Sequence, residues 1–504
     1  MEPSSSRTVV FRTDAAPCIG AGHVARCLSL AETFGAEGWR CRLACRAETP
    51  ETAPAIARCF RETLILEGVE EDEARAIAAR WPEGCDLLVV DHYGRAAPFE
   101  EALRPWARAI LAIDDLCRAH RCDYLLDPTP GRVAGDYAGR VPQGCEVYLG
   151  PAYVPLKSVF AERRARALAR RRKPGPVELI LVSLGATDPA NLTAFALGGI
   201  VRSGLKPAVE IVLGPVAPHR EEVRAQAAAL DLDVTVHEGL EDLADPMSRA
   251  DLAIGAAGIT SWERCCLGLP SVLVVTAGNQ RETAEALERA GAAVSLGWHS
   301  AVGPERIAAA VLELDRDPAR RARMGAKAAA LCDGRGARRV GMEILSNETA
   351  RDGRPVRLRP ATMADARIML RWQCDPRTRR YARNPAPPAA EEHQRWLADR
   401  LADPGCLFNL ILHGDAPAGV LRLDRIDGDQ DLDNTYEVSI LVAPDRHRLG
   451  IGRAALHLVR QLLPEAELRA EVLPGNVASD ALFRSAGFIR RKGLFYSPPE
   501  AGMP

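Results

Sequence analysis

Short apolar segments that alternate with helical patterns constrain the fold of this chain more than any other feature of its sequence. In the first third, five such segments are expected to be strands: residues 8–12, 40–46, 86–91, 109–114 and 123–127. Most are near-continuous apolar runs, which are typical of parallel strands buried on both faces. Helical patterns lie between most of them and predict βαβ units in a doubly wound sheet.

A second series of the same kind follows a basic segment, residues 158–176. Its expected strands are residues 177–185, 208–214, 233–239, 251–258 and 271–278. The basic segment reads as a solvated surface helix ended by a Pro-Gly-Pro sequence, because it lacks the interleaved aromatic side chains of a nucleic-acid surface. Two successive Rossmann-like lobes of similar size predict an enzyme with a cleft between them.

The pattern changes near residue 355 to mixed strands and helices over about one domain's length. Residues 346–355 are polar with Gly and Pro, which is typical of a linker. We therefore predict an α/β protein with two Rossmann-like lobes followed by a mixed α/β domain. The expected boundaries are residues 1–160 and 161–345 for the lobes, 346–354 for the linker and 355–504 for the last domain.

Composition narrows the class of protein. The chain has 504 residues, is 47% hydrophobic and carries a net charge of −2, so it has ample material for cores and no charge bias towards nucleic acid or membrane. No apolar run reaches the roughly 20 residues of a membrane span, and the first residues do not resemble a signal peptide. The fourteen cysteines lack metal-ligand spacing and are expected to be buried thiols in a cytoplasmic protein, with no metal.

The sequence "GAGHVA", residues 20–25, is the first candidate site. It fits the G-x-G-x-x-A dinucleotide fingerprint, but about seven residues separate its first glycine from the strand, and Arg42 and Arg46 occupy the next strand where that fold needs an acid. An NADP site is thus a minor alternative. Gly20 and Gly22 would let the backbone approach a ligand. His23 would begin a helix whose dipole disfavours the protonated imidazole, as a general base requires.

Further polar side chains follow the other expected strands. They are Asp91, His92 and Tyr93, then Asp114 and Asp115, then the glycine turns at Gly185 and Gly258 with Glu263, and finally Asn279 and Gln280. Two helix N-termini facing one cleft predict an anion site suited to a diphosphate, and a carboxylate one turn inside a helix suits a ribose diol. Each residue alone is as well explained by a helix cap or turn; their joint placement at successive strand ends favours a site.

Several of these motifs together resemble a known family. The segments "FRTDAAPCIGAGHVARCLSLA", "DHYG", "SLGATDPANL", "AAGITSWE" and "GNQ" are similar to the UDP-sugar hydrolases of pseudaminic acid biosynthesis, which have a GT-B fold like that of MurG-type glycosyltransferases. The resemblance covers roughly residues 7–345. It implies hydrolysis of UDP-2,4-diacetamido-2,4,6-trideoxy-β-L-altropyranose, with His23 and Tyr93 as catalytic residues. The substrate-binding residues that it implies are Gly20, Gly22, Asp91, Asn279, Gln280, Gly185, Gly258, Ile259 and Glu263.

The last domain resembles the GNAT superfamily of N-acetyltransferases. "DRHRLGIGRAALHLV" is similar to its Q/R-x-x-G-x-G/A motif, with His447 at the first position, and "PGNVASDALFRSAGF" is similar to its later Asn…Gly-Phe motif. Acetyl-CoA is thus the expected co-substrate, held by its pyrophosphate on backbone N–H groups. The cofactor-binding residues implied are Val442, Arg446, His447, Arg448, Gly450, Gly452, Arg453 and Asn476.

The catalytic residues of this domain are less clear. Phe483 replaces the tyrosine that serves many family members as general acid, so Tyr496, Tyr436 or water must protonate the CoA thiolate. Glu437 could accept the proton of the amine through water, or be a surface strand residue.

These observations predict a bifunctional enzyme that hydrolyses a UDP-sugar and acetylates the 4-amino group of the precursor UDP-amino sugar. A UDP-sugar glycosyltransferase with an acetyltransferase domain is one alternative. A non-catalytic lobe that binds the UDP-sugar for the acetyltransferase is another. The sequence leaves the oligomeric state open.

Overall fold

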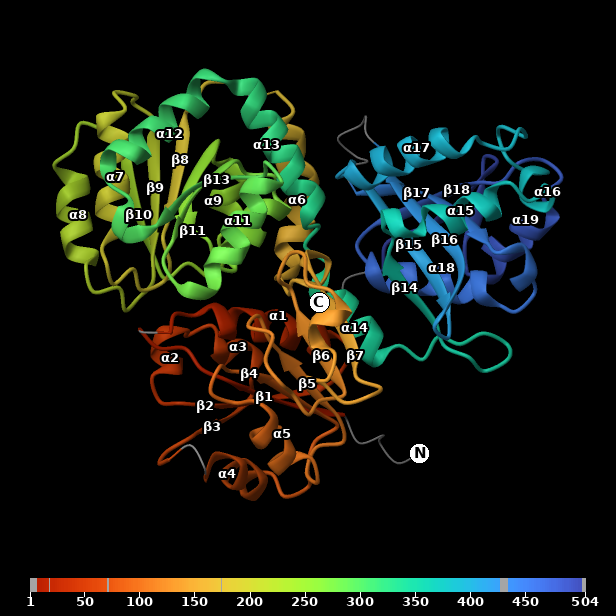
Figure 1. Cartoon of the computed structure of the whole chain (residues 1–504), viewed down its shortest axis with the longest axis horizontal. Coiled ribbons are helices and arrows are strands. Elements are labelled where there is room, and N and C mark those ends of the chain that lie inside the picture. Colours follow the sequence, from red (N-terminus) through yellow and green to blue (C-terminus); the bar gives the residue numbers. More distant parts are fainter. Residues whose placement is uncertain (1–6, 18, 70–71, 174, 427–433, 501–504) are drawn as a thin grey trace. The chain divides into compact units, whose positions relative to one another are not determined.

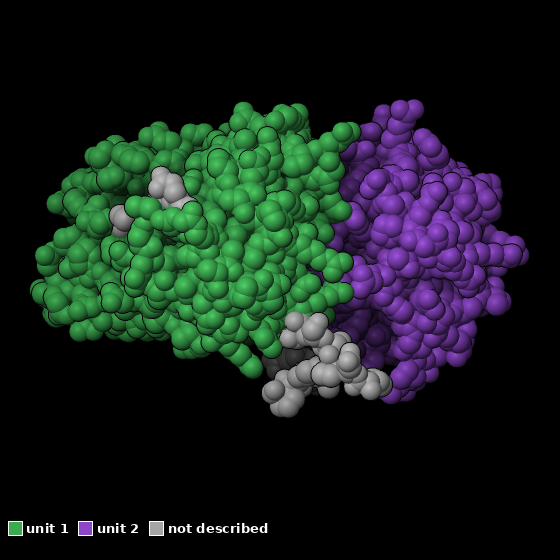
Figure 2. Space-filling model, turned by 90° about the horizontal axis from the view of Figure 1, so that it is seen from below, with its two compact units in different colours: residues 1–340 green, residues 341–504 purple. Residues whose placement is uncertain are grey.

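The computed structural model describes residues 7–17, 19–69, 72–173, 175–426 and 434–500. The first residues of the first predicted domain and the last residues of the last one, 1–6 and 501–504, lie outside the described residues. The chain divides into two compact units, residues 1–340 and 341–504 (Figure 2). The first unit contains two lobes, each a parallel sheet with helices around it (Figure 1). Among the described residues, no helix has the length and apolar character needed to cross a membrane.

The described part of the first lobe forms a seven-stranded parallel sheet in the order β3-β2-β1-β4-β5-β6-β7. The strands are β1 (Thr8–Thr13), β2 (Arg40–Cys45), β3 (Glu62–Ile65), β4 (Leu87–Asp91), β5 (Ile110–Ile113), β6 (Tyr124–Asp127) and β7 (Glu146–Leu149). The α-helices between them are α1 (Gly22–Ala36), α2 (Thr49–Thr52), α3 (Ile56–Cys59), α4 (Glu73–Arg80) and α5 (Ala97–Leu103). Strand order reverses between β1 and β4, which is where doubly wound sheets place their ligands.

The second lobe repeats this arrangement with a six-stranded parallel sheet, β10-β9-β8-β11-β12-β13, in its described residues. Its strands are β8 (Leu179–Ser183), β9 (Ala208–Leu213), β10 (Val234–Glu238), β11 (Leu252–Ala256), β12 (Ser271–Val275) and β13 (Val294–Trp298). Its helices are α7 (Leu192–Arg202), α8 (Arg220–Ala228), α9 (Ala244–Arg249), α10 (Thr260–Cys266), α11 (Arg281–Arg289), α12 (Pro304–Arg316) and α13 (Pro318–Leu331). The reversal falls between β8 and β11.

The basic helix α6 (Ser158–Arg171) is not simply solvated, which corrects the expectation from its charge. Phe160, Ala161, Ala167 and Leu168 are buried, and so is Arg164. The helix contacts α9, α10 and α13 of the second lobe. Some of its arginines therefore donate hydrogen bonds to neighbouring backbone carbonyls, as described below, and the helix is more than a charged surface.

The second unit is built on a mixed sheet in the order β14-β15-β16-β17-β18-β20-β19. The strands are β14 (Val356–Pro360), β15 (Cys406–His413), β16 (Ala416–Arg425), β17 (Thr435–Val442), β18 (Glu467–Glu471), β19 (Ile489–Arg491) and β20 (Leu494–Ser497). Its α-helices are α15 (Ala366–Gln373), α16 (Pro376–Arg379), α17 (Ala390–Ala402), α18 (Ile451–Leu462) and α19 (Val477–Ser485). Of the described strand pairs in this sheet, β17 with β18 is parallel and the others are antiparallel.

The boundary between the units lies inside helix α14 (Gly336–Leu345), before the expected linker at 346–354. That segment is hydrogen-bonded within the second unit. The Val356 N–H donates to the Glu348 carbonyl, and the Arg351 N–H donates to the Leu449 carbonyl, each at 2.8 Å. Ala350 belongs to the apolar core of the unit. A polar Gly-Pro sequence therefore marks a turn packed on the last domain.

Candidate active site

The loop after β1 carries the first candidate residues. Gly20 has a φ of +79°, and helix α1 begins two residues later at Gly22. No side chain caps this helix, and no acidic residue lies in its first turn. The first backbone N–H groups of a helix lack intrahelical partners, so this end favours a negatively charged or oxygen-rich ligand. His23 is the second residue of α1.

His23 forms a buried network with the end of β4. Its Nδ1 atom lies 2.6 Å from Asp91 Oδ1, and Arg26 donates to both oxygens of Asp91, at 2.7 and 3.0 Å. Asp91 was expected to bind substrate, but its side chain is 1% exposed and both oxygens are engaged. Asp91 therefore orients His23 from the protein interior, and both of its oxygens are already engaged by protein groups and are not available to a ligand.

The charges of this network bear on which nitrogen of His23 carries its proton. Burial alone would raise the pKa of Asp91, but Arg26 and His23 outweigh it and hold that pKa below its usual value. A carboxylate only accepts hydrogen bonds, so the 2.6 Å contact with Asp91 favours the His23 tautomer with the proton on Nδ1, although Arg26 Nη2, which is also a donor, lies 2.9 Å from the same nitrogen. Nε2 then keeps its lone pair, which is the arrangement of a general base oriented by a carboxylate.

Tyr93 and Asn279 meet at the same place, as the sequence led us to expect. The Tyr93 ring stands edge-on to the His23 ring, with centroids 4.6 Å apart. Its hydroxyl donates to Asp115 Oδ2 at 3.0 Å and accepts a hydrogen bond from Asn279 Nδ2 at 2.6 Å. Burial and Asp115 raise the pKa of Tyr93, so it stays a neutral phenol. Asn279 follows β12, so this bond joins the two lobes.

His92, the other histidine of this region, cannot serve as the base. Its Nδ1 accepts from the Gly94 N–H at 2.9 Å, and its Nε2 lies 3.2 Å from Asp14 Oδ2. Both nitrogens are thus used inside the protein. Arg26, in contrast, was missed by sequence reasoning, although its spacing of three residues from His23 on a helix places both on one face.

In the second lobe, the loop after β8 differs from expectation. Gly185 has a φ of +109°, but the start of α7 is already occupied. Asp188 accepts from the N–H groups of Leu192 and Thr193, each at 2.9 Å. The N-terminus of α7 is therefore neutralised by the chain's own carboxylate and is not an open anion site, although the turn at Gly185 itself is unaffected.

The loop after β11 keeps its expected features. A Cβ at Gly258 would lie 3.6 Å from Gln280 Nε2, and Gln280 Oε1 accepts from the Thr276 N–H at 3.0 Å, so Gln280 is held beside this loop and Ile259. Glu263 is half-buried, and its Oε2 atom has no hydrogen-bond partner within the described residues. Burial raises the pKa of Glu263 to about 7. A carboxylate next to this loop with one oxygen that lacks a hydrogen-bond partner suits the diol of a ribose.

The second unit has a glycine turn before α18. Arg448 and Gly450 have φ values of +67° and +80°, and the first backbone bond of the helix runs from the Ala454 N–H to the Gly450 carbonyl. The N–H groups of the first turn, including those of Gly452 and Arg453, lack intrahelical acceptors and suit a phosphate.

The side chains of this turn have different surroundings. Arg448 and Arg453 are exposed. His447 Nε2 lies 3.2 Å from the Val442 carbonyl, and Arg446 lies 3.1 Å from His413 Nδ1, so these two are held by the protein.

β17 and β18 part beside this turn. Their pairing ends at Glu437 and Arg469, while β17 continues to Val442. Arg383 donates to Glu437 at 2.8 Å and to Glu471 at 2.5 Å, and the Arg469 guanidinium lies over the Tyr496 ring. Arg469 is paired with Glu437 on one side and with Tyr496 on the other. These three residues therefore share one face of the sheet.

Two other candidates of this domain are structural at least in part. The Asn476 side-chain oxygen accepts from the Ser479 N–H at 3.1 Å and caps α19, so only its NH₂ group remains for a ligand. Phe483 is buried and packs against Phe488 and Phe495. Tyr436 also lies in this core, which leaves Tyr496 as the more accessible of the two tyrosines.

Comparison with known proteins agrees with this architecture. Residues 356–489 match the acetyltransferase (GNAT) domain family, and residues 180–339 match the glycosyltransferase family 28 C-terminal domain. Among solved structures, MurG of Acinetobacter baumannii has a TM-score of 0.50 at 18% identity and covers 67% of this chain and 99% of its own. The matches support an enzyme that combines a unit with a MurG-like GT-B fold and a domain similar to the GNAT acetyltransferases, and the predicted fold class is confirmed.

Two curated relatives each match more than half of the chain. UDP-2,4-diacetamido-2,4,6-trideoxy-β-L-altropyranose hydrolase of Campylobacter jejuni is 25% identical over 286 residues, 56% of this chain and 97% of that protein. Spore coat polysaccharide biosynthesis protein SpsG of Bacillus subtilis is 26% identical over 292 residues, 57% of this chain and 83% of that protein.

Proposed function

We propose that the first unit hydrolyses a UDP-sugar, with His23 as the base that activates water. The single observation that carries this proposal is the buried Asp91–His23 pair at the point of the sheet where strand order reverses. The activity for which the Campylobacter relative is named supports UDP-2,4-diacetamido-2,4,6-trideoxy-β-L-altropyranose as the substrate. The loops at Gly185 and Gly258, with Glu263, are the proposed nucleotide contacts.

The chemistry requires one base and a good leaving group. Water attacks the anomeric carbon as the bond to the UDP oxygen breaks, and His23 Nε2 takes the water proton. Asp91 stabilises the imidazolium that forms. UDP departs as an anion, so backbone N–H groups can absorb the charge without a general acid. His23 has the role that a carboxylate has in inverting glycosidases.

The GNAT domain is proposed to acetylate the 4-amino group of the precursor UDP-amino sugar, with acetyl-CoA as co-substrate. The amine attacks the thioester carbon, Glu437 accepts the amine proton, and Tyr496 protonates the departing thiolate. The turn from Arg446 to Arg453 holds the pyrophosphate. Arg383, which now pairs with Glu437, must release that carboxylate before it can act as a base.

Product identification tests this function. The full chain is incubated with the UDP-linked diacetamido sugar, and separately with the UDP-linked amino sugar and acetyl-CoA, and products are followed by NMR. We expect free sugar and UDP in the first reaction and an N-acetyl signal in the second. UDP release that depends on an added alcohol acceptor would favour a glycosyltransferase, which the family 28 match also suits. Binding without any turnover would favour a substrate-presenting lobe.

The elevated pKa of Glu263 predicts a pH effect on nucleoside binding. With a pKa of about 7, the carboxylate is charged above pH 7 and protonated below it. Only the charged form accepts hydrogen bonds from both ribose hydroxyls. Uridine, which carries no titrating phosphate, should bind up to about tenfold more weakly at pH 6 than at pH 8. Calorimetric titration measures this, and Glu263→Gln should bind weakly at both pH values. A flat profile in the wild type would exclude this role.

A further inference from the structure

Two buried arginines of the second lobe neutralise the ends of helices. Arg164 donates to the carbonyls of Ala329 and Cys332 at the end of α13, at 2.7 and 3.0 Å. Arg321 donates to those of Leu314 and Asp315 at the end of α12. Helix C-termini carry partial negative charge, so both guanidinium groups are compensated where they lie.

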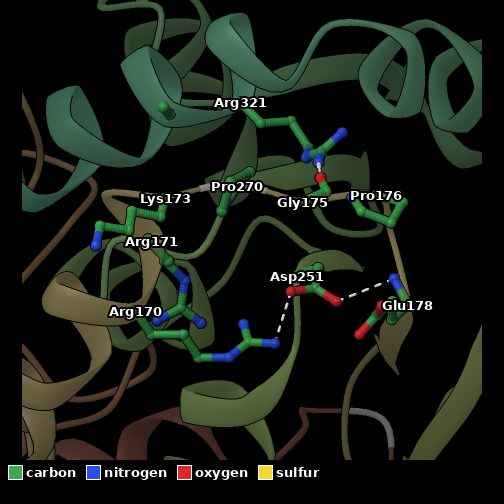
Figure 3. A pocket seen from close by; sticks show the side chains of 10 residues that line it. Arg170, Arg171, Lys173, Gly175, Pro176, Glu178, Asp251, Pro270 and Arg321 are labelled. Atoms are coloured by element: carbon green, nitrogen blue, oxygen red, sulfur yellow. Dashed lines mark hydrogen bonds and ion pairs between the residues drawn. The ribbon is translucent and has the colours of Figure 1, made fainter.

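Arg171 is a third arginine that donates to carbonyl groups near helix C-termini. It donates to the carbonyls of Leu267 and Ala250, beyond the ends of α10 and α9, at 2.9 and 3.0 Å. Together with Arg321 it lines a cavity of about 210 Å³ beside Glu178 and Asp251, which precede β8 and β11 (Figure 3). This cavity is therefore at the amino ends of the strands, opposite the edge that carries the candidate site.

Arg264 differs from these three in its position. It lies on α10 with 1% exposure, and its side chain reaches back to the start of that helix. Its Nη2 atom donates to the Ala256 carbonyl at 2.6 Å and to the Ser261 hydroxyl at 3.0 Å, and Nη1 contacts the Thr260 hydroxyl at 3.3 Å. Within the described residues its guanidinium forms no ion pair with a carboxylate, although the charge of the neighbouring Glu263 raises its pKa, and its Nε atom has no hydrogen-bond partner.

The charge of Arg264 thus lies at the positive end of a helix, where the backbone adds to it instead of compensating it. Burial lowers the pKa of Arg264 only to about 10, so it remains charged at neutral pH. Gly255 makes the position possible, since a Cβ there would lie 2.3 Å from Arg264 Nη1. A buried charge of this kind is costly unless an opposite charge comes close.

We propose that Arg264 is a positioning residue that supplies a buried positive charge to the diphosphate of UDP bound over the loop of residues 256–260. This inference rests on the proposed function of the first unit. A bound diphosphate would add negative charge at this point beyond that of Glu263, whose pKa of about 7 leaves it partly protonated at neutral pH. Arg264 would hold the loop through its carbonyl and hydroxyl contacts, and its field would stabilise the negative charge that develops on UDP as the sugar bond breaks.

Affinities for UDP, UMP and uridine, measured by calorimetry on the full chain, test this inference. In Arg264→Met and Arg264→Gln, UDP should bind about tenfold more weakly, UMP should lose less, and uridine should stay within about twofold. Arg264→Lys, which keeps the charge, should restore most of the difference. Arg171→Met is the matched control: it removes a comparable guanidinium at a helix C-terminus and should lower thermal stability without changing the ratio of UDP to uridine affinity.

The outcomes separate the possibilities. Equal losses for UDP and uridine would show that Arg264 only maintains the loop, and unchanged affinities would show that its charge does not reach the ligand; either result overturns the inference. If Arg264→Met fails to fold, the comparison of Arg264→Gln with Arg264→Lys decides. If the wild type binds no UDP at all, the proposed function itself fails. If the wild type binds UDP but the ratio of UDP to uridine affinity is unchanged in the variants, only the inference about Arg264 fails.

Discussion

Replacing His23 with alanine is expected to slow UDP release by ~10²–10⁴ while the dissociation constant for UDP stays unchanged. The loss follows from removal of the base at Nε2. Binding is spared because the proposed nucleotide contacts lie in the second lobe, on loops that His23 does not touch. Steady-state assays of UDP release and calorimetric titration with UDP measure the two effects on the same protein.

Two further variants make this prediction specific. Asp91→Asn keeps a side chain of nearly the same size next to His23 but removes the negative charge that favours a proton on Nδ1. It should therefore lower turnover in the same assay. His219→Ala, a partly exposed histidine of the second lobe that pairs with Glu222, should behave as wild type. Near-normal turnover in His23→Ala would remove His23 from the mechanism.

Gly450→Val is expected to reduce acetyl transfer by about 10²-fold or more and to leave UDP release intact. Gly450 has a φ of +80°, where a β-branched side chain is strained by about 1–3 kcal/mol. The new Cβ would also lie 3.3 Å from the Arg351 side chain. The turn must then shift, and a displacement of about 1 Å at a binding loop can cost 10²-fold. Acetyl transfer is measured by release of CoA thiol.

A control for strain is available in the same unit. Gly414 has a φ of +60° and open space around its Cβ position, in the turn between β15 and β16. Gly414→Val should lower the thermal stability of the unit through its strained backbone but keep acetyl transfer by the folded protein. If Gly450→Val and Gly414→Val reduce acetyl transfer equally, or if Gly450→Val transfers normally, the turn before α18 does not hold acetyl-CoA.

Most of the strands that the sequence predicted lie at the centres of the two parallel sheets, and one of them, β10, is an edge strand. β1, β4 and β8 are buried along nearly their whole length, so their apolar runs are continuous. β3, β7 and β13 were missed. All three lie at sheet edges, where residues are partly exposed and the apolar signal is interrupted. β10, also a partly exposed edge strand, was predicted from its run of β-branched residues, so the interrupted apolar pattern explains the three misses better than the edge position alone.

The proximity of some candidate site residues was predictable from their type and position, while their roles stay predictions. His23, Tyr93 and Asn279 were expected together and do meet. Roles that depend on the direction of a side chain were not predictable. Asp91 turns inward to His23, and Asp188 folds back over α7, although both follow strands in the same way as a ligand-binding carboxylate would.

The separation of β17 from β18 has a consequence for the unliganded acetyltransferase domain. Beyond Glu437, β17 pairs with none of the described residues on its β18 side, so part of a sheet interior is left as an open strand edge. Such edges are templates for pairing with another chain. A ligand whose amide groups lie along β17 would complete the hydrogen bonding there. We therefore expect the empty domain to self-associate more readily than the domain with a ligand along β17.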